Sequence, residues 1–201
     1  LVVCDTSGSM YGGYGSVSPI DVSVSLAIYL AERNDDPTFG NAFLTFSSHP
    51  QLQRIAKGNI LEKISAISRA DWGYNTDLQA VFDVILETAK NKNLGNDNLP
   101  EKVYIVSDME FDSACENDEN SNYTTIKKKF EAEGFKCPEL IFWNVNADGC
   151  QLPVTKDDHG TCMVSGCSPA ILTAILSGEE INPIQVMLDA IDIDRYSSVI
   201  V

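Results

Sequence analysis

The residues best suited to chemistry follow directly after the first apolar run, residues 1–4. Asp5, Ser7 and Ser9 stand there at alternate positions. Alternate residues of an extended segment point the same way, so one carboxylate and two hydroxyls converge. Oxygen ligands of this kind suit a hard cation, Mg²⁺ or Mn²⁺ above all, with Ca²⁺ as an alternative. We therefore predict a metal site at the tip of the first strand.

Two later residues extend this ligand set. Thr76 lies just before a helical pattern, and Asp108 follows the apolar segment 102–107. Each residue also has a simpler interpretation: the serines as turn or cap residues of their loop, Thr76 as the cap of the helix that follows, and Asp108 as a solvated turn residue. Considered together, the five residues favour metal binding.

The elements that must position these residues alternate between short apolar strands and amphipathic helices, which is typical of a mostly parallel α/β sheet. We predict a Rossmann-like three-layer sandwich of residues 1–201, a single domain with helices on both faces and one short antiparallel edge strand. The predicted strands are 1–5, 41–47, 52–56, 102–107, 139–144 and 161–165, with a short strand or tail at 196–201. The predicted helices are 19–32, 60–68, 77–90, 123–133, 169–176 and 183–191.

Ligands of open parallel sheets bind outside the carboxyl ends of the strands. Asp5, Asp108, Asn144 and Ser165 all lie at predicted strand ends, and the acidic loop 112–122 follows Asp108 closely. We expect a partner-binding rim around the metal. Its candidate residues are Met10, Tyr11, Tyr74, Asn75, Glu110, Asp112, Asn144 and Ser165.

Composition limits the classes of partner. The 201 residues carry 29 acidic and 14 basic side chains, a net charge of −15, which opposes a nucleic-acid-binding surface because phosphates require Lys and Arg patches. The cluster 127–129 of three lysines indicates a solvated helix face. No stretch approaches the roughly 20 apolar residues of a membrane span. The sequence begins directly in a predicted strand and has no initiator Met, so we expect it to be one domain of a longer protein.

The six cysteines are spread along the chain without a C-x-x-C motif, and the two histidines, His49 and His159, are far apart. This arrangement does not favour a zinc site. We expect free, mostly buried thiols in a reducing compartment, and hence a cytoplasmic location.

The five positions Asp5, Ser7, Ser9, Thr76 and Asp108 resemble the metal-ion-dependent adhesion site (MIDAS) of von Willebrand factor A (vWA) domains. The order of strands and helices fits that family across nearly the whole chain. The resemblance implies that the serines bind Mg²⁺ directly and that the aspartates often act through water. It also implies that a partner protein completes the coordination with a carboxylate or another oxygen.

A more specific resemblance, to one group within the vWA domains, is carried by segments 2–10, 72–77, 107–112, 142–144 and 164–168. Together they are similar to the carboxy-terminal half of an uncharacterised family related to the Ro autoantigen (TROVE) proteins. In Ro-type proteins a helical ring binds RNA and the A domain sits beside it. The resemblance implies that any RNA association belongs to a region outside these residues.

The leading hypothesis is a metal-dependent protein-interaction domain without enzymatic activity. One alternative is a Mg²⁺-dependent phosphoryl-transfer or hydrolase domain, but Ser7 stands where phosphatases of the haloacid-dehalogenase type need a second Asp. The chain contains no P-loop motif and no credible Ser/His/Asp set. The other alternative is a structural vWA domain whose site is vestigial.

Overall fold

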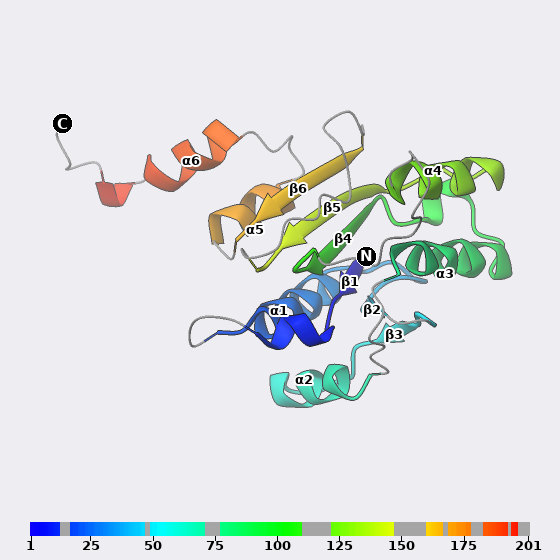
Figure 1. Cartoon of the computed structure of the whole chain (residues 1–201), viewed down its shortest axis with the longest axis horizontal. Coiled ribbons are helices and arrows are strands. Elements are labelled where there is room, and N and C mark those ends of the chain that lie inside the picture. Colours follow the sequence, from blue (N-terminus) through cyan, green and yellow to red (C-terminus); the bar gives the residue numbers. More distant parts are fainter. Residues whose placement is uncertain are drawn as a thin grey trace. The chain divides into compact units, whose positions relative to one another are not determined.

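The computed structural model contains a six-stranded sheet in the order β3-β2-β1-β4-β5-β6 (Figure 1). Only the β2–β3 pair is antiparallel. The strands are β1 (Val2–Cys4), β2 (Ala42–Thr45), β3 (Leu52–Arg54), β4 (Lys102–Ser107), β5 (Glu139–Asn144) and β6 (Thr161–Ser165). The structure describes residues 1–12, 17–46, 49–70, 77–109, 122–146, 160–166, 169–177, 183–192 and 194–196.

The chain forms two compact units, Leu1–Ser165 and Gly166–Val201. The first unit holds the sheet and the helices α1 (Pro19–Glu32), α2 (Ile60–Ser68), α3 (Leu78–Asn91) and α4 (Asn122–Ala132), with short 3₁₀ helices η1 (Gly8–Tyr11) and η2 (Asn96–Asn98). The second unit holds α5 (Pro169–Leu176), α6 (Pro183–Ile191) and η3 (Asp194–Tyr196), and α5 packs against α6.

The predicted fold class is confirmed: a mostly parallel sheet with one antiparallel edge strand and helices on both faces. The 3₁₀ turn η1 was not predicted, because the sequence of residues 8–11 indicates only an irregular loop. The predicted acidic loop 112–122 lies outside the described residues except for Asn122. The predicted terminal strand 196–201 also lies outside them after residue 196.

The side chains of each strand alternate between the two faces of the sheet, and different helices cover each face. Val3, Ile105 and Phe142 belong to the main core, which α3 and α4 complete with Phe82 and Phe130. The rings of these two phenylalanines meet edge to face, with centroids 6.2 Å apart. The intervening strand residues point to the opposite face, where α1 packs on β1, β2 and β4.

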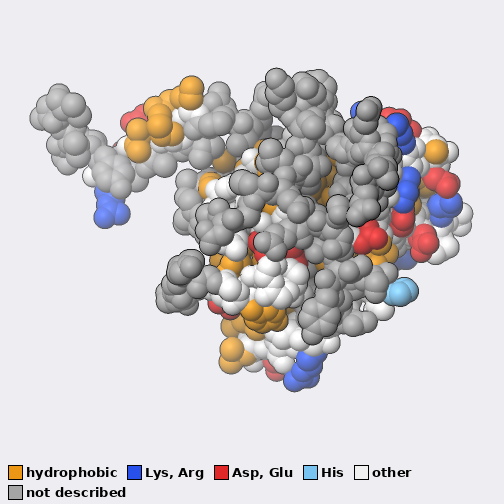
Figure 2. All heavy atoms as spheres, in the orientation of Figure 1, with side chains coloured by type: hydrophobic (Ala, Val, Ile, Leu, Met, Phe, Trp, Pro, Cys, Tyr) orange, Lys and Arg blue, Asp and Glu red, His pale blue; other side chains and the backbone are white. Residues whose placement is uncertain are grey.

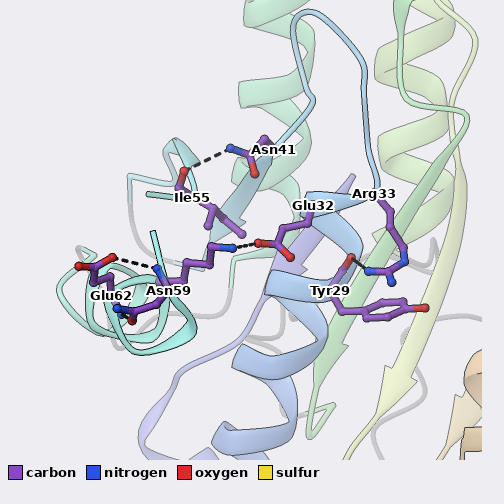
Figure 3. Close-up of polar contacts among 8 residues, drawn as sticks. Tyr29, Glu32, Arg33, Asn41, Ile55, Asn59 and Glu62 are labelled. Carbon is purple, nitrogen blue, oxygen red and sulfur yellow. Dashed lines mark hydrogen bonds and ion pairs between the residues drawn. The ribbon is translucent and has the colours of Figure 1, made fainter. Parts of the chain in front are cut away.

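Polar contacts tie α2 to α1 (Figure 3). At the start of α2, the Asn59 side chain accepts from the Glu62 amide while the Glu62 carboxylate accepts from the Asn59 amide. This reciprocal capping box satisfies two amide donors that a helix start otherwise leaves unpaired. One turn along, Lys63 forms an ion pair with Glu32 at the end of α1, so α2 is held both at its first turn and by its neighbour.

The antiparallel edge is fastened by Arg54 of β3. Its guanidinium donates to the carbonyl oxygens of Gly40 at 2.7 Å and of Pro37 and Thr38, both at 3.2 Å. Asp36 closes the same loop by accepting from the Thr38 and Phe39 amides. The α1–β2 connection is therefore fixed by one positive and one negative side chain.

Charged side chains of both signs lie together over α3 and α4, at the right of the face shown in Figure 2. Lys129 contacts both carboxylate oxygens of Asp83, at 2.8 and 2.9 Å, and Lys90 pairs with Glu133 at 2.8 Å. At least one lysine of the 127–129 cluster is thus paired with an acid, which fits the interpretation of that cluster as a solvated helix face.

Three cysteines within the described residues, Cys4, Cys137 and Cys162, are free thiols. Burial raises the pKa of Cys4 and of Cys137, each to about 12, so both stay protonated near neutral pH. Cys115, Cys150 and Cys167 lie outside the described residues. Among the helices that the structure describes, none is long and apolar enough to cross a bilayer.

Candidate metal centre

The candidate centre lies where the order of the strands reverses. From β1 the chain proceeds outward to β2 and β3 on one side, and later to β4, β5 and β6 on the other. The carboxyl ends of β1 and β4 are neighbours at this point, in the parallel register Cys4 to Val106. A crevice at such a switch point is where open α/β sheets bind their ligands.

Asp5 is the first residue after β1, and its amide continues the ladder by donating to the Val106 carbonyl at 3.0 Å. Its side chain is fully buried. One carboxylate oxygen, Oδ1, accepts from the Ser7 amide at 2.9 Å, and the other, Oδ2, accepts from the Ser107 hydroxyl at 2.5 Å. Burial raises the pKa of Asp5, and the neighbouring Asp108 carboxylate adds to that rise against the opposing hydrogen bonds.

The two serines are presented by η1. The Met10 amide donates to the Ser7 carbonyl and the Gly12 amide to the Ser9 carbonyl, both at 3.1 Å. Met10 is fully buried and anchors this turn. The Ser7 hydroxyl makes no capping bond to η1. Instead it lies 3.0 Å from the Ser9 hydroxyl. The alternative that the Ser7 hydroxyl caps this segment is therefore wrong, whereas the alternative of a turn residue agrees with the bond from the Met10 amide to the Ser7 carbonyl.

Asp108 follows β4 and is only 1% exposed. The alternative that it is a solvated turn residue is therefore wrong. The next residue, Met109, has a φ of +67°, the left-handed region that side chains other than glycine rarely adopt. The strand thus ends in a turn immediately after the second carboxylate.

Thr76 falls outside the described residues, as do Tyr74, Asn75, Glu110 and Asp112. The neighbouring helix α3 is capped by Asp77, whose carboxylate accepts from the Ala80 amide at 3.1 Å. The alternative that Thr76 caps this helix is therefore wrong.

The described members of the predicted rim differ in exposure. Tyr11 is 67% exposed, whereas Met10 is fully buried and serves as an anchor rather than as a contact surface. Asn144, at the end of β5, is largely buried, and its side-chain oxygen accepts from the Asn146 amide at 2.9 Å. Ser165 is exposed at the end of β6, paired in register with Asn144.

Sequence reasoning missed Ser107, which is fully buried beside the site. Its hydroxyl bonds to Asp5 and accepts from the Met109 amide at 3.0 Å. A serine as the last residue of an otherwise apolar strand, directly before a candidate ligand, is the signal that could have identified it. Thr45, at the neighbouring end of β2, is 1% exposed, and its hydroxyl has no hydrogen-bond partner among the described residues.

The described residues fit a small hard cation. In an octahedral Mg²⁺ site with bonds of about 2.1 Å, neighbouring ligand oxygens lie about 3.0 Å apart. The Ser7 and Ser9 hydroxyls have this separation. The buried Asp5 carboxylate accepts from the Ser7 amide and lies near the buried Asp108 carboxylate, and positive charge would offset the cost of burying both. Among the described residues, no three His, Cys, Asp or Glu side chains group to hold a metal, so a ligand set drawn from this part of the chain would include the serine hydroxyls.

Comparison with known proteins agrees with this architecture. The chain is 31% identical to "Uncharacterized protein L728" of Acanthamoeba polyphaga mimivirus over 191 residues, which are 94% of this chain and 32% of that relative. The chain thus spans about a third of the length of the curated relative it matches.

Two solved structures share the fold at 16% sequence identity. The RO (RSR) protein of Deinococcus radiodurans matches with a TM-score of 0.60 over 89% of this chain and 34% of that protein. The SpRpn10 VWA domain matches with a TM-score of 0.50, over 89% of this chain and 93% of that domain. The fold is therefore that of a vWA domain. Residues 1–195 match the family described as "Domain of unknown function (DUF7788)", and the chain belongs to that family.

Proposed function

We propose that this domain is a metal-dependent protein-interaction module of the MIDAS type. Ser7 and Ser9 would hold Mg²⁺ or Mn²⁺, assisted by Asp5, Asp108 and Thr76. The observation that carries the proposal is the pair of serine hydroxyls, 3.0 Å apart and presented beside a fully buried aspartate at the sheet's switch point. The vWA fold, which commonly serves protein interactions, supports it.

The roles of the described residues follow from their surroundings. Both oxygens of Asp5 already accept protein hydrogen bonds, so its carboxylate fixes the serine loop and supplies negative charge. The serines are neutral, and a cation held mainly by hydroxyls keeps a strong preference for a further anionic oxygen. When bound, the ion would therefore join this site to a carboxylate on a partner protein.

The proposal involves binding without catalysis. Ser7 occupies the position where a phosphatase-type mechanism would need a second acid. We also propose that the domain works within a longer protein of the Ro type, in the cytoplasm, and that any RNA is bound by another region. The net charge of −15 supports this assignment, because it repels phosphate backbones.

Thermal unfolding in EDTA, Mg²⁺, Mn²⁺ and Ca²⁺ tests the metal site. An ion that binds only the folded state adds about 2.7 kcal/mol at a free concentration one hundred times its Kd. We expect Mg²⁺ or Mn²⁺ to raise the midpoint of the parent but not of the Ser7→Ala/Ser9→Ala variant. The matched control is Ser25→Ala/Ser68→Ala, which removes two exposed hydroxyls that bond only within their own helices.

A parent midpoint that no ion shifts at millimolar concentration would contradict metal binding and leave the structural vWA interpretation. The partner is tested next, with a short acidic peptide and its amide-for-carboxylate counterpart. Binding of the acidic peptide in Mg²⁺, with loss of binding in EDTA, is the expected result. Equal binding of both peptides would refute the role of the carboxylate.

A further inference from the structure

We infer that Ser107 is a positioning residue of the metal site, and that one hydroxyl group orients the parts of the site contributed by β1 and β4. The inference rests on the proposed metal-binding function and concerns a residue outside the five MIDAS positions.

The direction of the hydrogen bonds fixes the role of this hydroxyl. A serine hydroxyl has one proton to donate and lone pairs that accept. The Met109 amide can only donate, so the Ser107 oxygen accepts from it at 3.0 Å. The single hydroxyl proton is then left for Asp5 Oδ2, 2.5 Å away. This bond to a charged acceptor is of the strong, short type.

The Ser107 backbone is fixed independently. Its carbonyl accepts from the Val145 amide at 3.1 Å, which ties the residue to the end of β5. The Asp5 amide donates to Val106, the residue just before Ser107. The hydroxyl therefore projects from a backbone held by strands on both sides, and Asp5 is held between this hydroxyl and the Ser7 amide.

The same hydroxyl also acts on the second carboxylate. Asp108 lies between Ser107 and Met109, and the Met109 amide must turn back to reach the Ser107 oxygen. Met109 adopts a φ of +67°, a conformation that costs a non-glycine residue on the order of 1 kcal/mol or more. The bond to Ser107 helps to stabilise this turn and thereby sets where Asp108 leaves the sheet.

Groups that orient metal ligands typically change metal affinity about 10- to 100-fold when they are removed. We expect Ser107→Ala to raise the Kd for Mn²⁺, titrated by electron paramagnetic resonance, by a factor in this range. Ser107→Cys keeps the packing but donates weakly, and should also raise the Kd. Ser107→Thr retains the hydroxyl and should bind close to the parent.

Ser23→Ala is the matched control. Ser23 is equally buried, on α1, and its hydroxyl bonds to the Val106 carbonyl and to the Cys4 thiol on the opposite face of the same strands. Its loss should lower stability without weakening Mn²⁺ binding. A Kd that is unchanged in both Ser107→Ala and Ser107→Cys, or that rises equally in Ser23→Ala, would overturn the inference.

A metal-free measurement tests the same geometry. In EDTA, the Met109 amide should exchange its hydrogen faster in Ser107→Ala than in the parent or in Ser23→Ala. Unchanged exchange would show that the hydroxyl does not hold the turn. A parent that fails to bind Mn²⁺ would remove the proposed function and this inference together, whereas normal binding by both the parent and the Ser107 variants would remove the inference alone.

Discussion

Replacement of Asp5 by asparagine separates the cost of the buried charge from its value to the site. The folded protein buries this carboxyl completely, and burial raises its pKa above that of the unfolded chain. As pH rises past the ordinary aspartate value of about 3.9, the unfolded state releases its proton first. The stability of the metal-free parent should then fall until the folded carboxyl also ionises. The Asp5→Asn variant has no charge to bury at this position and should lack this loss.

The magnitude follows from one proton of difference between the two states. While that difference lasts, the free energy of unfolding changes by about 1.4 kcal/mol per pH unit. For a domain of this size, such a change corresponds to a midpoint shift of about 3 to 6 °C. In EDTA, the stability of the Asp5→Asn variant relative to the parent should therefore rise by up to about that amount per pH unit as the pH increases above the ordinary aspartate value. Geometry permits the exchange, because the oxygen of the new amide can accept from the Ser7 amide while its NH₂ donates to the Ser107 oxygen.

Saturating Mg²⁺ should reverse this advantage at pH 7, because the parent gains binding energy that the variant has lost. The assay is thermal unfolding from pH 3.5 to 7.5, with and without the ion. The control is Asp21→Asn, since the hydroxyl and the amide of Ser18 lower the pKa of the exposed Asp21. Because its pKa is lowered in the folded state, Asp21 should stabilise the fold as pH rises. The free energy of unfolding of the Asp21→Asn variant should therefore fall relative to that of the parent. A difference between the parent and the Asp5→Asn variant that stays constant from pH 3.5 to 7.5 in EDTA would refute the reasoning.

Substitutions at two further positions, Thr45 and Arg54, test a buried hydroxyl and a loop contact of the sheet. Thr45→Val replaces a buried hydroxyl that has no partner among the described residues, and it should raise the free energy of unfolding in urea by about 1 kcal/mol. Thr45→Ser keeps the hydroxyl, removes a methyl group and should lower the free energy of unfolding. A destabilising Thr45→Val would show that the hydroxyl is satisfied. Arg54→Lys should cost about 1 to 2 kcal/mol in the same assay, because an ammonium cannot serve three carbonyls as a fork. Arg33→Lys, which alters one carbonyl contact at 3.3 Å and the stacking of the guanidinium on the ring of Tyr29, leaves the three loop carbonyls of Arg54 untouched and should cost less. Equal losses would count against the role of Arg54 in holding the 37–40 loop.

The sequence predicted best what depends on local periodicity. The bounds of β4, β5 and α2 were predicted correctly, because each combines a clear apolar period with a clear end signal. The position of Asp108 at a strand end followed from β4 alone. The short turn η1 was not predicted, since a single 3₁₀ turn has no period to detect and depends on burial of Met10.

The supporting contacts could not be predicted from local pattern. Ser107 becomes important only because β1 pairs with β4, which brings it to Asp5 across 102 positions of sequence. Arg54 likewise looks like an ordinary exposed strand residue until the chain returns and places three carbonyls of the 37–40 loop before it. Long-range register decides both, and the sequence alone does not contain that register.

The pairing of β1 with β4 also sets the order of events during synthesis. Val2 pairs with Tyr104, so the central strand of the sheet stays without one of its two neighbours until more than 100 further residues have been made. At about 5 to 20 residues per second, that delay amounts to several seconds or more. During this interval β4 has not yet paired with β1, so Asp5 and Asp108 of the nascent chain are still apart. Under the proposed function, a nascent chain should therefore not bind the ion before β1 and β4 have paired, so that metal binding would indicate that both sides of the sheet have formed.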